Sequence, residues 1–282
     1  IESRQLTTSQ SQNIQDFEFK VSSQWGEDGI IQYLTRNISI PRKVFVEIGV
    51  GNYTESNTRF LLQNDYWSGL VIDGVPEYID YIKSDPLVYW AHNLKAECAF
   101  VNKENVNDLI KSSGLSGDIG LLSIDIDGND YWIWQAIDVI HPRIVICEYN
   151  SLFGANHKIV VPYEPNFDRR KAHYSNIYYG ASLSALSELA KTKGYSLVGT
   201  GRAGLNAFFV RTDVIGDLAI RNPQDAYSMP QVRESMDESG RLTYLSVEER
   251  RRLIRELKVV YLDTGKILSI HDVLTESETS SP

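Results

Sequence analysis

The chain has 282 residues and a formal net charge of −9, and 42% of its residues are hydrophobic. This length suits one large α/β domain with extensions, and the negative charge disfavours a general nucleic-acid binder. Cys98 and Cys147 both lie in apolar runs, so we expect two buried thiols, no disulfide framework and a reducing compartment. No apolar run reaches the ~20 residues needed to span a membrane, and no signal peptide opens the sequence. These features predict a cytoplasmic protein.

Strand-like and helix-like segments alternate through the first half of the chain. Residues 1–20 are polar and rich in Ser, Gln and Thr, and we expect a flexible arm there. Apolar residues with helical spacing then predict a helix within residues 22–37. Five β-rich runs follow, with helical segments between them, at 43–49, 68–74, 94–101, 119–125 and 143–150. This alternation predicts an α/β fold with a Rossmann-like, doubly wound, mostly parallel sheet.

The segment 151–180 is organised differently. It contains prolines, a run of basic residues and many tyrosines without clear periodicity, which is typical of a lid or a binding loop. A helix at 182–194 and two closely spaced strands at 195–201 and 205–213 follow it. We therefore predict one domain over residues 21–212, with residues 151–180 as its lid.

A C-terminal appendage is predicted over residues 213–282. Its clearest element is a helix at 246–263, which begins with a capping box between Ser246 and Glu249. The last eight residues, 275–282, are polar and are expected to be disordered.

The strongest local motif is the sequence VFVEIGVGNYTESNT. A strand ends near Glu47, and Gly49 and Gly51 form a turn before a helix. Glycines let a ligand approach the backbone, and the free N–H groups at a helix start attract an anion. Thr54 stands where a dinucleotide-binding fingerprint has glycine, which disfavours NAD or FAD. Asp73 ends the next strand, at the place where an acid binds ribose hydroxyls.

These four residues, Glu47, Gly49, Gly51 and Asp73, together resemble class I S-adenosylmethionine-dependent methyltransferases. In that family the first acid and the glycine turn hold the methionine part of the cofactor, and the second acid holds the ribose. The sequences SQWGEDG and IDIDGN and the segment 178–211 resemble the FkbM-like branch of the superfamily. The resemblance covers roughly residues 20–212. It implies an inserted antiparallel hairpin strand and methyl transfer, often to a hydroxyl of a sugar or polyketide-like acceptor.

The resemblance also assigns a cofactor site for S-adenosylmethionine. Gln24, before the first strand, and Ser56 and Asn57, at the helix start, are expected to reach the cofactor's carboxylate. The full set of expected cofactor-binding residues is Gln24, Glu47, Gly49, Gly51, Ser56, Asn57, Asp73 and Asp125.

The acidic stretch LLSIDIDGND, residues 121–130, allows three interpretations. A phosphatase of the haloacid dehalogenase type would use Asp125 as its nucleophile, but its motif has Thr where Asn129 stands and normally lies on the first strand. A calcium loop needs glycine at its sixth position, whereas Gly128 is fourth. A methyltransferase would place the stretch at the carboxyl end of the fourth strand, where open α/β sheets bind ligands.

The third interpretation predicts a metal site. Alternation along a strand would put Asp125 and Asp127 on one face, and two close carboxylates repel each other unless a cation or a proton lies between them. Glu148 and Asn150 end the neighbouring strand, and four oxygen-bearing side chains suit Mg²⁺ or Mn²⁺. This set is similar to that of catechol-type O-methyltransferases, except that Tyr149 separates the acid from the amide. The alternative is that Asp125 caps backbone N–H groups and Glu148 pairs with a lid arginine.

A hydroxyl acceptor must lose its proton as the methyl group arrives. We expect His157 or His173 of the lid to be the base, with Asp127 as a further catalytic residue. The basic run Arg169, Arg170 and Lys171 is either a solvated charge run or a clamp for a phosphate or carboxylate on the acceptor.

The predicted function is S-adenosylmethionine-dependent methyl transfer, as O-methylation of a sugar or another small hydroxylated acceptor with help from a divalent metal. A metal-dependent phosphatase using Asp125 and a non-catalytic cofactor-binding module are the alternatives. The expected partner is a small-molecule acceptor such as a glycan precursor, with no nucleic acid and no membrane span. The sequence also leaves a homo-oligomer open.

Overall fold

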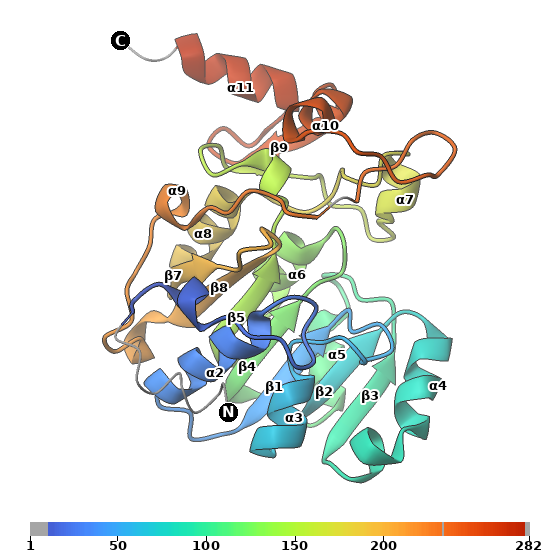
Figure 1. Cartoon of the computed structure of the whole chain (residues 1–282), viewed down its shortest axis with the longest axis vertical. Helices are drawn as coiled ribbons and strands as arrows, with labels where there is room; N and C mark the ends of the chain where they lie inside the picture. Colours follow the sequence, from blue (N-terminus) through green and yellow to red (C-terminus); the bar gives the residue numbers. More distant parts are fainter. Residues whose placement is uncertain (1–10, 233, 280–282) are drawn as a thin grey trace.

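A computed structural model describes residues 11–232 and 234–279 of the chain. Its centre is a seven-stranded sheet in the order β3-β2-β1-β4-β5-β8-β7 (Figure 1). In chain order these strands are β1 (Val44–Ile48), β2 (Ser68–Asp73), β3 (Leu94–Cys98), β4 (Gly117–Ile124), β5 (Ile140–Glu148), β7 (Tyr195–Thr200) and β8 (Asn206–Arg211). Strands β1 to β5 run parallel to one another, and β8 is antiparallel to both β5 and β7. The predicted Rossmann-like sheet with an antiparallel hairpin strand is confirmed.

Helices cover both faces of this sheet. One face carries α2 (Glu27–Asn37), α3 (Arg59–Asp65) and α4 (Pro76–Ser84), and the other carries α5 (Val106–Ser112), α6 (Asp130–Ala136) and α8 (Leu183–Thr192). Leu121 and Leu122 are neighbours on β4 and lie in opposite cores, because successive side chains of a strand point to opposite faces. Burial on both faces explains why the strands are nearly continuous apolar runs in the sequence.

Short helical turns complete the main domain at Ile14–Phe17, Pro86–Trp90, Ser151–Phe153 and Thr212–Val214. The first of them lies within the predicted flexible arm. Ile14 and Phe17 are buried there, and the Phe17 ring stacks on Tyr33 with centroids 3.8 Å apart. The prediction of a loose segment is therefore wrong for this turn, because two apolar side chains dock it on the domain. Residues 1–10 of the predicted arm lie outside the described residues.

A second sheet joins the lid to the C-terminal appendage. It has three strands in the order β10-β9-β6, namely β6 (Ile159–Val160), β9 (Lys258–Tyr261) and β10 (Lys266–Ser269). Phe153 and Tyr179 of the lid share a hydrophobic core with Ile254 and Val259 of the appendage. The later part of the appendage, with β9, and α7 (Arg169–Ala172) lie in the upper part of the view in Figure 1.

The appendage departs from its predicted form in two places. The capping box of Ser246 and Glu249 is present, but the helix α10 (Val247–Ile254) ends well before the predicted end. The β-branched pair Val259–Val260 lies instead in β9, because it finds strand partners in β6 and β10. The expected disordered tail is partly helical, since α11 (Ile270–Thr279) includes residues 275–279. The remaining helix of the appendage is α9 (Pro223–Ala226).

The two cysteines differ in exposure. Cys147 is buried in β5, as predicted, whereas Cys98 is exposed at the end of β3. Strand β3 is the edge of the sheet, so only part of it is covered, and the prediction of two buried thiols is wrong for Cys98.

Among the residues that the structure describes, no helix combines the length and the apolar character needed to cross a membrane.

Candidate active site

A cavity of about 1030 Å³ opens at the carboxyl edge of the parallel strands. Segments that follow β1, β2, β3, β4 and β5 all contribute to its lining. Ligands of open α/β sheets bind at this edge, because the loops after the strands converge there. The cavity is therefore the candidate active site of the protein.

The glycine turn after β1 forms one wall of the cavity. Gly49 and Gly51 have φ values of 83° and 54°, which other residues adopt at a cost. A Cβ atom at Gly49 would lie 1.7 Å from the carbonyl oxygen of Asp125, whereas a Cβ at Gly51 would meet nothing within 4 Å. Gly49 therefore allows the ends of β1 and β4 to approach each other, and Gly51 leaves space on the cavity side.

Glu47 fixes the start of the segment that follows the turn. One carboxylate oxygen accepts a hydrogen bond from the Asn57 N–H at 2.9 Å, and the other accepts from the N–H and the hydroxyl of Thr58. Burial raises the pKa of Glu47, and these donors oppose the shift by stabilising the ionised form. Asn57 also donates its side-chain amide to Ser123 on β4, at 3.0 Å. The acid thus holds the cavity wall in shape.

Asp73, at the end of β2, links two turns. Its carboxylate accepts hydrogen bonds from the N–H of Gly51 at 2.8 Å and from the N–H of Val75 at 2.9 Å. Each carboxylate oxygen has a second lone pair, so both oxygens retain capacity for ligand hydroxyls. Gln24 and Ser56 also line the cavity, so every expected cofactor residue lies on it.

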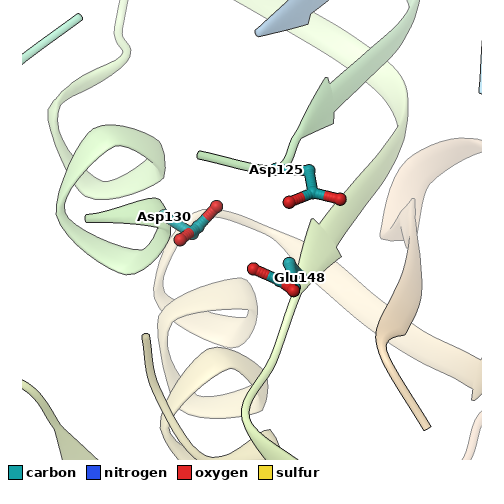
Figure 2. Close-up of side chains that lie close together, drawn as sticks. All are labelled: Asp125, Asp130 and Glu148. Atoms are coloured by element: carbon teal, nitrogen blue, oxygen red, sulfur yellow. The ribbon is translucent and has the colours of Figure 1, made fainter. Parts of the chain in front are cut away.

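A cluster of three carboxylates lies on the side of β4 and β5, and two of its members, Asp125 and Glu148, line the cavity as its acidic floor. Asp125 follows β4, Asp130 begins α6, and Glu148 ends β5, and Figure 2 shows their side chains converging. One carboxylate oxygen from each lies within 4.8 Å of the others. The sequence predicted Asp125 and Glu148 in such a group but missed Asp130.

Asp130 organises the turn between β4 and α6. Its two oxygens accept hydrogen bonds from the N–H groups of Ile126 at 2.8 Å and Gly128 at 2.9 Å. Burial raises the pKa of Asp130 to about 6 despite these donors. The alternative prediction gave this capping role to Asp125, whereas the structure gives it to Asp130. An acid placed two residues after Gly128, at a helix start, was the available sequence signal.

The carboxylates of Asp125 and Glu148 lie close together, with one oxygen of each within 4.8 Å of the other. Burial, followed by the charges of neighbouring acids, raises the pKa of both carboxyls well above the ordinary range. Glu148 is only 5% exposed, and its Oε2 atom has no hydrogen-bond partner among the described residues. A bound ligand can donate the hydrogen bond that such a buried oxygen lacks.

Two residues of the predicted metal set are placed differently. Strand β4 ends at Ile124, so strand alternation does not govern Asp127, which has a φ of 56° and is exposed. It forms an ion pair of 2.8 Å with Arg169 instead of joining the cluster. The Asn150 amide donates to the carbonyls of Ile177 and Tyr179, and its oxygen accepts from the Leu152 N–H. Asn150 is therefore a structural residue of the lid, and its prediction as a ligand is wrong.

The lid and the appendage together cover the acidic floor. Arg169 of α7 lies 3.3 Å from Glu234 of the appendage as well as beside Asp127. Its guanidinium lies over the Tyr179 ring, 5.0 Å from the centroid, and the Tyr179 hydroxyl donates to Glu234. The pKa of Glu234 is raised by burial, which Arg169 opposes. The sequence did not indicate that residues Val232 and Glu234, far along the chain, would line this cavity.

The rest of the basic run lies at the rim of the cavity. Arg170 and Lys171 are exposed and line it, and Lys171 pairs with Asp168 at 3.2 Å. Arg169 is thus the member of the run that is committed to internal ion pairs.

Neither lid histidine lies among the residues that line the cavity. The Nδ1 atom of His173 is 2.6 Å from the Ser175 hydroxyl, and burial lowers the pKa of its imidazole. The carbonyl of His157 accepts from the Ser182 hydroxyl at the start of α8. The structure does not bring the two predicted bases to the acidic cluster, and the carboxylates are the groups in position to accept a proton.

Comparison with known proteins finds no matching family model and no matching curated protein. Solved structures with a similar fold include an O-methyltransferase from Bacillus cereus in complex with SAH, at 13% identity and a TM-score of 0.41, covering 74% of this chain and 88% of that chain. The N-terminal domain of EvdMO1 with SAH bound matches at 11% identity and a TM-score of 0.39, over 74% and 93%. The fibrillarin pre-rRNA processing protein of Methanococcus jannaschii matches at 8% identity and a TM-score of 0.41, over 73% and 86%.

Proposed function

We propose that the protein is an S-adenosylmethionine-dependent methyltransferase that methylates a hydroxyl group of a small acceptor. The observation that carries the proposal is the layout of the cavity. Glu47, the turn of Gly49 and Gly51, and Asp73 line the part of it that follows β1 and β2, and Asp125 and Glu148 line the part that follows β4 and β5. A nucleoside-bearing cofactor and an acceptor can therefore meet within a single cavity.

The polarity of the wall supports one orientation of the cofactor. Asp73 has free lone pairs for two ribose hydroxyls, and the exposed rings of Tyr78 and Phe100 flank it as apolar surface for adenine. The methionine part then lies along the glycine turn, with Gln24 at its far end. This orientation directs the sulfonium methyl group toward Asp125 and Glu148.

The reaction is a displacement at the methyl carbon. The acceptor oxygen forms a bond to that carbon while the carbon–sulfur bond breaks, and its electron pair stays on sulfur to give S-adenosylhomocysteine. The hydroxyl proton passes to a carboxylate of the acidic floor, for which Glu148 Oε2 is the open position. Positioning of the two reactants supplies much of the rate, because it removes the entropy cost of their encounter.

A divalent cation fits the same floor. Asp125, Asp130 and Glu148 each offer one hard oxygen ligand, and these three oxygens lie within 4.8 Å of one another. These three residues would hold Mg²⁺ or Mn²⁺, in place of the predicted set that included Asp127 and Asn150. Such a cation lowers the pKa of a bound hydroxyl and so favours its deprotonation.

Calorimetry with S-adenosylmethionine tests the proposal directly. The wild-type protein is expected to bind it, and Asp73→Ala is expected to weaken binding by ~1–3 kcal/mol through lost ribose hydrogen bonds. The control is Asp108→Ala, which changes an exposed acid of α5 that does not line the cavity. Unchanged affinity in folded Asp73→Ala would contradict the ribose assignment. Absence of binding to the wild type would refute the function, and binding without turnover of any acceptor would favour a non-catalytic module.

A further inference from the structure

Asn206 lies beside Glu148 on the wall of the cavity. It is the first residue of β8, and it is the register partner of Glu148 in the antiparallel pair of β5 and β8. Both residues line the cavity, and each is 5% exposed. Directly opposed residues of an antiparallel pair project from the same face of the sheet, with Cβ atoms about 4.5–5.5 Å apart.

The two side chains share an unusual property. Asn206 Oδ1, like Glu148 Oε2, is buried and has no hydrogen-bond partner within the described part of the chain. Buried polar atoms in folded proteins are nearly always paired, with protein, water or ligand. Two such oxygens on adjacent strands, both at one cavity, point to a ligand that supplies two donors.

The orientation of the Asn206 amide is set by its surroundings. Its Nδ2 atom donates to Oε1 of Glu27 at 3.1 Å, and the other oxygen of Glu27 accepts from the N–H of Trp25 at 2.9 Å. A flipped amide would direct its oxygen at the carboxylate of Glu27, which is only 2% exposed. Oδ1 is therefore held as the atom available to a ligand.

We propose that Glu148 and Asn206 together bind two neighbouring hydroxyl groups of the acceptor, so that the acceptor is a vicinal diol such as a sugar ring presents. This inference rests on the proposed methyl transfer and narrows its substrate class. One hydroxyl donates to Glu148 and is the one that becomes methylated. The second donates to Asn206, which acts as a specificity-determining residue that selects which hydroxyl is presented to the methyl group.

The presence of two unpaired oxygens supports a diol over a single donor. Vicinal hydroxyls are borne by adjacent carbons, so two donors reach two acceptors a few ångströms apart without distortion. Asn206 is uncharged and is already bonded to Glu27, so its oxygen suits a neutral O–H group. A site built to bond a hydroxyl also discriminates strongly against an analogue that lacks it, because the site oxygen then remains unpaired.

The test combines substrate analogues with a variant. Methyl hexopyranosides with cis or trans vicinal hydroxyls, each with its two monodeoxy analogues, are incubated with S-adenosylmethionine, and kcat/KM is measured. A diol glycoside is expected to be methylated, and removal of the neighbouring hydroxyl should lower kcat/KM about 10-fold or more. Asn206→Leu should cause a similar loss on the diol and little further loss on the deoxy sugar, with cofactor affinity unchanged.

The control variant is Asn93→Leu, which changes an exposed asparagine that does not line the cavity. It should alter neither kcat/KM nor cofactor affinity. If Asn206→Leu fails to fold, Asn206→Ser and the wild-type deoxy series carry the test. Three outcomes would each overturn the inference. The first is equal kcat/KM for the diol and the deoxy sugars, and the second is methylation of amines only. The third is that protein that binds S-adenosylmethionine methylates no glycoside. Failure to bind the cofactor at all would instead refute the proposed function.

Discussion

The two glycines of the turn after β1 are expected to respond to the same substitution in opposite ways. Gly49→Ala should destabilise the protein, because its Cβ would lie 1.7 Å from the carbonyl oxygen of Asp125. That obstacle is backbone, so no side-chain rotation can relieve it. Gly51→Ala should leave stability nearly intact, because nothing lies within 4 Å of its Cβ, but the added methyl group would narrow the cofactor side of the cavity.

The magnitudes follow from two contributions. Both positions have positive φ, which costs an alanine ~1–2 kcal/mol. At Gly49 the overlap with β4 adds ~1–3 kcal/mol or more, because the ends of β1 and β4 must separate. The free energy of unfolding should therefore fall by ~2–5 kcal/mol in Gly49→Ala and by ~1–2 kcal/mol in Gly51→Ala.

Urea unfolding of the two variants measures the changes in the free energy of unfolding. Calorimetry with S-adenosylmethionine measures the change in cofactor affinity. Folded Gly51→Ala should bind the cofactor at least tenfold more weakly than the wild type. The reasoning is refuted if Gly49→Ala is no less stable than Gly51→Ala. It is also refuted if Gly51→Ala binds the cofactor with wild-type affinity.

Three further outcomes are expected. A chelator should abolish methyl transfer without changing cofactor affinity, and Mg²⁺ or Mn²⁺ should restore it; turnover that survives chelation would exclude a required metal. His173→Gln should retain methyl transfer. Burial lowers the pKa of His173 in the folded protein, so below pH ~6.5 the unfolded chain binds a proton more readily than the folded chain. The free energy of unfolding of the wild type should therefore decrease as the pH is lowered, and it should decrease less in His173→Gln. Urea titrations at several pH values measure both. Trypsin should cut after the exposed Arg170 or Lys171, and bound cofactor with acceptor should slow cleavage; equal rates would indicate a rim that ligands do not contact.

The sequence predicted the main sheet because its signals are local. Each parallel strand is a buried run of apolar and β-branched residues, and glycine or polar residues separate it from the next helix. The short strands of the second sheet carry no such signal. Two-residue β6 is stabilised by its pairing with β9, some hundred residues later in the chain, and that pairing overrides the helical pattern near Val259.

Some residues of the candidate site could likewise be predicted from the sequence, and others could not. Glu47 and Asp73 end strands that could be located from the sequence, so their placement at the sheet edge followed from topology. Asp127 was misplaced because its backbone leaves the strand and adopts a left-handed conformation, which reverses the expected alternation. Asn206 could not be found, because its position beside Glu148 depends on the register of an antiparallel pair.

The electrostatics of the floor explain why the lid and the appendage belong to the site. Burial, and after it the negative charges of Asp127 and Asp130, raise the pKa of both Asp125 and Glu148. Arg169 of the lid opposes these shifts in both Asp125 and Glu148, and Glu234 of the appendage helps to hold Arg169 in place. Movement of the lid would therefore change the proton affinity of the floor as well as access to it. The positive charge of Arg169 favours the ionised forms of Asp125 and Glu148, and only an ionised carboxylate can accept a proton from the acceptor hydroxyl.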